Sequence, residues 1–237
     1  MEQEQEKAWD KRRALRVMAA TRAWIAQRRA ENVGDGGEKE ASDAALRTGW
    51  PVQIAAIGER ECGNGAENLR IDYEFVPTPW GGALVAATER GLCRLAFTDD
   101  REAAVGDLQR LFPRAELRQR SAYWSDAARM AMQSAGDRAA RERSEVLPIK
   151  LHLRGTAFQM RVWRALTEIP AGGLLAYGDV AAMTGCGAAH RAVGTAVGRN
   201  PVALFVPCHR IVQASGALGG YHWGVAYKKA LLDSEKY

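Results

Sequence analysis

The residues best suited to chemistry lie in the segment Val206-Pro207-Cys208-His209-Arg210. The thiolate is the nucleophilic form of cysteine, and cationic or proton-accepting neighbours favour it by lowering the thiol pKa. His209 and Arg210 place positive or proton-accepting groups next to the sulfur in sequence, so the segment favours a reactive thiolate at Cys208. Adjacent side chains of a strand point to opposite faces, so the pair would need a sharp turn or a bridging water. From these residues alone a second interpretation stays open, in which Cys208 is an inert core cysteine next to a surface histidine.

Two short helical patterns precede this segment, over residues 178–183 and 188–199, with a break at Gly185-Cys186-Gly187. Two short helices around a glycine turn have the form of a helix-turn-helix. The second is rich in small residues, which leave little steric barrier between a helix backbone and its partner. A helix packed tightly in the core would show the same composition.

Positive charge is concentrated in the same part of the chain. Residues 150–237 hold ten Lys or Arg and four Asp or Glu, whereas residues 1–149 have a net charge of −1. This asymmetry suits a partner with a phosphate backbone, although a solvated basic surface would look alike.

The middle of the chain has the pattern of an α+β unit. Apolar residues alternate at Ile71, Tyr73 and Phe75, and the runs 84–88 and 92–97 are joined by a hairpin turn. Helical patterns follow at 101–112 and 121–135, and then a strand at 149–153. Thr156 is placed to cap a helix that carries Phe158, Val162 and Leu166 on one face.

Composition excludes several classes of protein. Of the 237 residues 47% are hydrophobic and 26% are charged, as in soluble globular proteins. No run approaches the roughly 18 apolar residues of a membrane span, and the N-terminus has no apolar signal region. The four cysteines form no C-x-x-C pair. We therefore expect no membrane partner, no structural metal, and a reducing cytoplasm.

Further motifs continue the pattern along the chain. They are Gly155-Thr156-Ala157-Phe158-Gln159, Val162-Trp163, Ile169-Pro170, Tyr177, Arg191-Ala192-Val193-Gly194, Asn200-Pro201, Pro207-Cys208-His209-Arg210, Gly219-Gly220-Tyr221 and Leu231-Leu232 with Glu235. From about residue 67 to the end, this order resembles the methylated-DNA–protein-cysteine methyltransferases, which repair O6-alkylguanine. The likeness is greatest to the repair half of the bacterial adaptive-response protein. The metal-binding cysteine module of that protein has no counterpart here, since no cysteine precedes Cys62.

The resemblance implies roles for two residues of this segment, Cys208 and His209, and for Glu235 and Asn200 elsewhere in the chain. Cys208 would accept the alkyl group irreversibly, so each molecule would act once. His209 would take the thiol proton through a water, and Glu235 would orient the imidazole. Asn200 would hold the active-site turn by hydrogen bonds. No cofactor is implied.

The implied partner is double-stranded DNA containing O6-alkylguanine, bound by a monomer through the minor groove with the damaged base flipped out. Tyr177 would press on the target phosphate and Arg191 would fill the vacated stack; the small-residue helix would add Ala189, Ala192 and Gly194. The substrate pocket would be lined by Val206, Pro207, Gly220, Tyr221, His222 and Trp223. Trp223 stands where some members carry a glycine, and this predicts a narrow pocket.

The expected fold is α+β in three parts. Residues 1–66 are a charged helical extension and linker without an assigned role. Residues 67–148 form a ribonuclease H-like α+β domain, and residues 149–237 a mainly helical, winged helix-turn-helix alkyltransferase domain. Three other functions stay open: a damage sensor without transfer, which would lack the acceptor cysteine; a transcriptional regulator; and a Cys-His thiol hydrolase, which would turn over.

Overall fold

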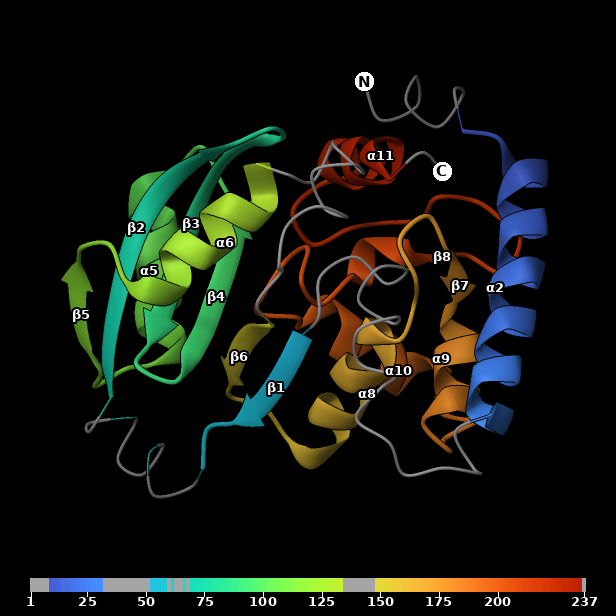
Figure 1. Ribbon diagram of the computed structural model, residues 1–237, viewed down its shortest axis with the longest axis horizontal. Coiled ribbons are helices and arrows are strands. Elements are labelled where there is room, and N and C mark those ends of the chain that lie inside the picture. Colours follow the sequence, from blue (N-terminus) through green and yellow to red (C-terminus); the bar gives the residue numbers. More distant parts are fainter. Residues whose placement is uncertain are drawn as a thin grey trace. The chain divides into compact units, whose positions relative to one another are not determined.

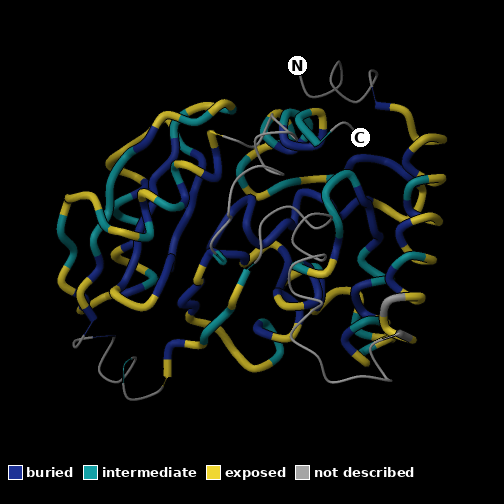
Figure 2. The backbone as a smooth tube through the Cα atoms, viewed as in Figure 1, coloured by how far each residue is buried: buried dark blue, intermediate teal, exposed yellow. Residues whose placement is uncertain are grey.

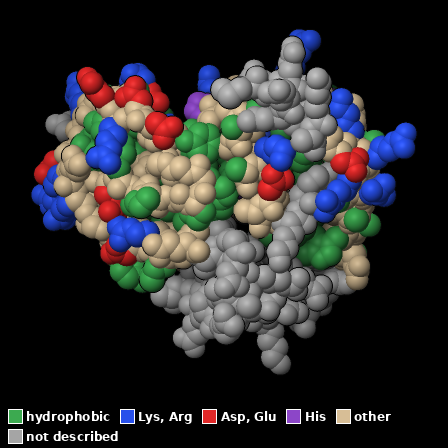
Figure 3. Space-filling model, turned by 90° about the horizontal axis from the view of Figure 1, so that it is seen from above, with side chains coloured by type: hydrophobic (Ala, Val, Ile, Leu, Met, Phe, Trp, Pro, Cys, Tyr) green, Lys and Arg blue, Asp and Glu red, His purple; other side chains and the backbone are tan. Residues whose placement is uncertain are grey.

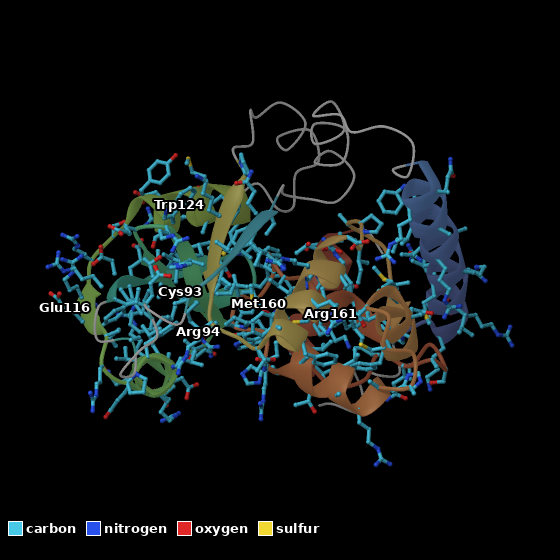
Figure 4. The ribbon with its side chains drawn as sticks, turned by 90° about the horizontal axis from the view of Figure 1, so that it is seen from below. Cys93, Arg94, Glu116, Trp124, Met160 and Arg161 are labelled. Carbon is cyan, nitrogen blue, oxygen red and sulfur yellow. The ribbon has the colours of Figure 1, made fainter. Side chains whose placement is uncertain are left out.

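A computed structural model describes residues 9–31, 52–58, 61, 66, 69–133 and 148–235 (Figure 1). The chain divides into two compact units. One, the helical unit, comprises residues 1–51, 161–200 and 206–237, and the other, the sheet unit, comprises residues 52–160 and 201–205. The division falls within one helix, α8 (Ala157–Thr167), between the neighbouring residues Met160 and Arg161 (Figure 4). No helix among the described residues is long and apolar enough to cross a membrane.

The sheet unit contains six strands in the order β1-β6-β4-β3-β2-β5. Strands β2 (Arg70–Thr78), β3 (Gly81–Thr88) and β4 (Gly91–Phe97) are joined as antiparallel neighbours, and the turn between β3 and β4 is the expected hairpin. Strands β1 (Val52–Ala56) and β6 (Ile149–Leu153) pair in parallel, and β5 (Glu116–Gln119) runs parallel to β2 at the other edge. β3 and β4 are buried along most of their length (Figure 2).

Alternation along β2 gives the sheet two different faces. Ile71 packs with Ala104 and Leu108 of helix α5 (Arg101–Leu111), which begins at an Asp100 side chain that accepts the Ala103 N–H. On the opposite face Glu74 accepts a 2.7 Å bond from Arg129 of helix α6 (Tyr123–Gln133). Side chains of a strand alternate between its two faces, so α5 covers the face of β2 that carries Ile71 and α6 covers the face that carries Glu74.

The helical unit is built around two very short parallel strands, β7 (Leu175–Ala176) and β8 (Ile211–Val212). Helix α9 (Tyr177–Met183) follows β7 directly, and α10 (His190–Gly198) comes next. A single 3₁₀ turn, η1 (Cys208–Arg210), leads into β8, and α11 (Val225–Ser234) ends the described chain. Tyr177 therefore follows directly after β7, and the reactive segment leads directly into β8, the strand that pairs with β7.

The predicted α+β class is confirmed, as are the helices and strands expected between residues 70 and 133 and the strand at 149–153. The side chain of Thr156 accepts the Gln159 N–H, which confirms the predicted cap of α8. The charged N-terminal helix is present as α2 (Lys11–Glu31). Within the N-terminal 66 residues, the polar, glycine-rich stretch 32–44 has the composition of the expected linker, and it lies outside the described residues. Strands β1, β5, β7 and β8 were not predicted.

Candidate active site

Cys208 lies at the start of η1, where the chain turns sharply after Pro207. The turn is closed by the Arg210 N–H, which donates to the Pro207 carbonyl at 3.0 Å. An extended backbone would direct Cys208 and His209 to opposite faces. The 3₁₀ turn removes that obstacle and draws both side chains into the protein interior, where they are 4% and 0% exposed.

Asn200 holds this turn from the end of α10. Its side-chain Nδ2 donates both to the Cys208 Sγ at 3.0 Å and to the Val206 carbonyl at 2.7 Å. The asparagine is itself buried. One amide group therefore binds both the sulfur and the backbone carbonyl two residues before it.

The resting thiol differs from the sequence prediction, which had its pKa lowered by neighbouring positive charge. Burial raises the pKa of Cys208 to about 11, and the hydrogen bond from Asn200, the charge of Lys228 and the Tyr221 hydroxyl oppose this only in part. Arg210 does not face the sulfur but forms an ion pair with Glu235. The sulfur is therefore protonated at neutral pH, and its proton must leave as the sulfur reacts.

His209 and Glu235 form the pair that can receive this proton. The imidazole Nε2 lies 3.0 Å from Oε1 of Glu235. Since an ionised carboxylate only accepts hydrogen bonds, it holds the proton on Nε2 and leaves Nδ1 as the basic nitrogen. Nδ1 is buried and has no hydrogen-bond partner within the described part of the chain. Burial lowers the pKa of His209, so the ring is neutral at rest.

Glu235 is kept ionised by its surroundings. Burial alone would raise its pKa, but the Arg210 guanidinium and His209 bring the pKa of Glu235 well below its ordinary value. Arg210 contacts both carboxylate oxygens, at 2.7 Å and 3.1 Å, and also donates to the Ile169 carbonyl. The Gly172 N–H completes the set at 3.0 Å from Oε2. A carboxylate fixed in this way can stabilise an imidazolium when His209 takes a proton.

Lys228 is a residue of the site that the sequence analysis missed. It is 1% exposed on α11, and its Nζ donates to the carbonyls of Ile211, Leu218 and Gly220. Burial lowers its pKa to about 8, and its charge favours the Cys208 thiolate. The available signal was its spacing from Glu235, since residues seven apart share one face of a helix.

The predicted DNA-binding residues lie on α9 and α10. Tyr177 is the first residue of α9, and a Cβ added to Gly194 of α10 would lie 3.9 Å from the tyrosine ring. Val193, Ala196 and Val197 are buried, whereas Arg191 and Ala192 are exposed. Ala189 directly precedes the helix and is half-buried. The small residues therefore do not all pack in the core: α10 presents an open face with an arginine near its start.

The predicted pocket residues differ in position. Val206 and Pro207, which directly precede Cys208, are buried, while Gly220 and His222 are exposed. Tyr221 interacts with the sulfur, and burial raises the pKa of its hydroxyl well above the ordinary value. The Trp223 ring packs on the Tyr221 ring, with centroids 5.3 Å apart. Trp223 is thus one ring removed from the thiol.

These features define a class: a buried Cys-His-Glu nucleophile next to a pair of short helices with an exposed small-residue face. Residues 157–237 match the family model described as "6-O-methylguanine DNA methyltransferase, DNA binding domain". The chain is 35% identical over 168 residues to a methylated-DNA–protein-cysteine methyltransferase of Methanosarcina barkeri, covering 69% of this chain and 96% of the relative. It therefore belongs to the methylated-DNA–protein-cysteine methyltransferase family.

Two further comparisons agree. The chain is 33% identical over 222 residues to the Escherichia coli protein named "Bifunctional transcriptional activator/DNA repair enzyme Ada", covering 90% of this chain and 61% of that relative. It thus spans about three fifths of the length of that longer protein. A crystal structure of Mycobacterium tuberculosis OGT in complex with DNA matches with a TM-score of 0.56 and 35% identity, over 70% of this chain and 92% of the other.

Proposed function

We propose that this protein transfers an alkyl group from the O6 atom of guanine in DNA to Sγ of Cys208. The observation that carries the proposal is the His209–Glu235 pair: the carboxylate fixes Nε2 and leaves a buried, basic Nδ1 on the residue that directly follows Cys208. A thiol with a pKa of about 11 is unreactive until a base takes its proton. The site has such a base.

The transfer is a single displacement. The bond from Sγ to the alkyl carbon forms as the bond from that carbon to O6 breaks, and the electrons of the broken bond stay on guanine. The thiol proton passes to His209, in our proposal through a water molecule; the imidazolium then gives up a proton to solvent and the released guanine takes one from solvent, so the proton count is unchanged. Asn200 and Lys228 stabilise negative charge on sulfur during this step. The product is a thioether, so each molecule acts once.

The substrate is proposed to be double-stranded DNA that carries O6-alkylguanine, approached through its minor groove. A guanine inside a duplex must be extruded before Cys208 can reach its alkyl group. The exposed face of α10 suits close approach to a groove, with Arg191 filling the vacated stack and Tyr177 turning the phosphate. The pocket would be closed by Val206, Pro207, Gly220, Tyr221, His222 and Trp223.

Finer points of architecture belong to the same proposal. We assign the strands and helices of residues 67–148 to a ribonuclease H-like domain, and residues 149–237 to a winged helix-turn-helix domain with α9 and α10 as its two helices. The protein is proposed to act as a monomer in the cytoplasm, where Cys208 stays reduced.

The test is intact-mass measurement after incubation with an O6-methylguanine duplex. We expect a gain of one methyl group per molecule, mapped to Cys208, and no further product when substrate is in excess. Cys208→Ala should gain nothing and still bind DNA, since phosphate contacts come from other residues. An unchanged protein mass after incubation with intact O6-methylguanine duplex would refute the proposal. Continued turnover would also refute it and would favour a thiol hydrolase.

A further inference from the structure

Helix α2 is bound to the helical unit along its whole length. Near its start, the Trp9 indole N–H donates to the Gly216 carbonyl at 2.7 Å. In the middle, the buried Thr21 hydroxyl accepts the Leu174 N–H at 3.2 Å. Farther on, Arg22 forms two bonds to Asp179 of α9, at 2.8 Å and 3.0 Å. These contacts fix α2 against the loop at Gly216, the residue before β7, and α9.

The helix is far more basic than the chain around it. Its 21 residues include seven Lys or Arg and one Glu. Arg22 and Arg29 are engaged with Asp179 and Glu168 of the same unit. Four more basic residues lie in the first two turns and are exposed; we call them the basic end of α2: Lys11, Arg12, Arg13 and Arg16. Figure 3 shows Lys and Arg side chains gathered at the right of the view, over α2.

A short series of neighbouring residues connects the basic end of α2 to Tyr221, which we call the rim of the candidate active site. A Cβ added to Gly216 would lie 2.7 Å from the Lys11 carbonyl and 3.1 Å from the Leu15 side chain. The loop ending at Gly216 starts with Gln213, whose side chain would lie 3.3 Å from a Cβ on Gly219. Gly219 leads directly to Tyr221, which interacts with Cys208. The segment from Gln213 to Gly220, exposed at residues 213–215 and buried at 216–218, therefore connects the contact with the basic end to Tyr221.

We propose that the basic end of α2 binds the phosphate backbone of duplex DNA next to the base that enters the active site. A base delivered to Cys208 brings its flanking strand across the rim, and duplex DNA carries a negative charge about every 1.7 Å along its axis. Arginine pairs with phosphate through two parallel hydrogen bonds. This surface lies outside the residues that match the DNA-binding family model, 157–237.

The inference rests on the proposed function for the DNA substrate, and salt-dependent binding tests it separately. We would measure the dissociation constant of the full-length protein for an undamaged duplex between 50 mM and 300 mM salt, by fluorescence anisotropy. The variant is the triple substitution Lys11→Gln, Arg12→Gln, Arg16→Gln. Each lost phosphate contact reduces the slope of log affinity against log salt by about 0.9. We expect the slope to fall by about 2 to 3 and the affinity at 0.15 M to fall roughly ten- to a hundredfold.

A matched control removes the same charge elsewhere. Arg101→Gln, Arg110→Gln, Arg114→Gln changes three exposed arginines of the sheet unit and should leave the slope within about half a contact of wild type. A second variant, Arg12→Lys with Arg16→Lys, keeps the charge and should keep the slope. If the glutamine triple binds no worse than the control triple, or if the lysine variant loses as much affinity as the glutamine triple, the inference is wrong.

The proposed function has its own readout in the same samples. Transfer to wild-type protein from free O6-methylguanine requires no duplex, so its absence would count against the transfer chemistry and leave the binding slopes interpretable. Truncation of α2 is not a suitable test, because Met18 and Thr21 belong to the buried core and their loss would disturb the unit.

Discussion

Nε2 of His209 lies 3.0 Å from Oε1 of Glu235, and neither side chain has appreciable access to solvent. The same carboxylate receives the Arg210 guanidinium at 2.7 Å. Glu235 therefore holds two partners with different tasks: it sets the imidazole tautomer and it neutralises a buried cation. Reactivity and stability depend on the same side chain, and experiments must separate the two.

Replacing the base tests the chemical step. His209→Ala should slow transfer from both duplex and free alkylguanine, typically by 10²- to 10⁴-fold for a positioned general base. Because burial lowers the pKa of His209 below 6.5, wild-type transfer should stay constant near neutral pH and decline only on acidification below that value. Single-turnover rates between pH 5 and pH 8 measure this. A decline that begins above pH 7 would contradict it.

Glu235→Gln tests the stability contribution. The substitution leaves the Arg210 charge buried without its partner, which costs about 3–5 kcal/mol. Urea unfolding at pH 7 measures the loss. The control is Asp233→Asn on the same helix, which removes an exposed pair with Lys229 and should cost about 0.2–1 kcal/mol. Equal losses in the two variants would refute the role of Glu235.

The pH dependence of stability follows from the same ion pair. The folded-state pKa of Glu235 is lowered, so folding is favoured at pH values above the ordinary carboxyl range, and this contribution disappears as the pH falls below about 4 toward the folded-state value. Unfolding free energy should therefore fall more steeply on acidification in wild type than in Glu235→Gln. Parallel curves would contradict the assignment.

Arg191→Ala separates base extrusion from chemistry. Only the duplex requires extrusion, so transfer from duplex DNA should slow much more than transfer from free alkylguanine. Arg199→Ala, at the other end of the same helix and also exposed, serves as the control for lost charge. Equal losses on both substrates would assign Arg191 to the chemical step or to the fold.

Trp223 tests pocket width. Its ring packs on Tyr221, and overfilling a close-packed site costs about 1–3 kcal/mol. Transfer from a benzyl adduct should therefore be about 5- to 150-fold slower than from a methyl adduct. Trp223→Gly should recover part of the benzyl rate, whereas Trp223→Phe, which keeps a ring against Tyr221, should recover less. A glycine variant that only loses stability would show that the indole is structural.

Local pattern was enough to predict much of the fold. The alternation of Ile71, Tyr73 and Phe75 places β2, because side chains of a strand alternate between its two faces. The cap at Thr156 places α8 for an equally local reason. β1, β5, β7 and β8 are short, and their pairing depends on distant chain, so no local signal marks them.

The sequence by itself also determined the candidate reactive residues, since Pro207-Cys208-His209 and the order of the motifs around this segment can be read directly from the chain. Tertiary structure decided how those residues behave. Burial, which no local pattern measures, raises the Cys208 pKa and lowers that of His209. Packing of α11 brings Lys228 and Glu235 to the turn, and Arg210 consequently pairs with Glu235 instead of facing the sulfur. Contacts between residues far apart in the chain set these energies, and only the folded protein contains them.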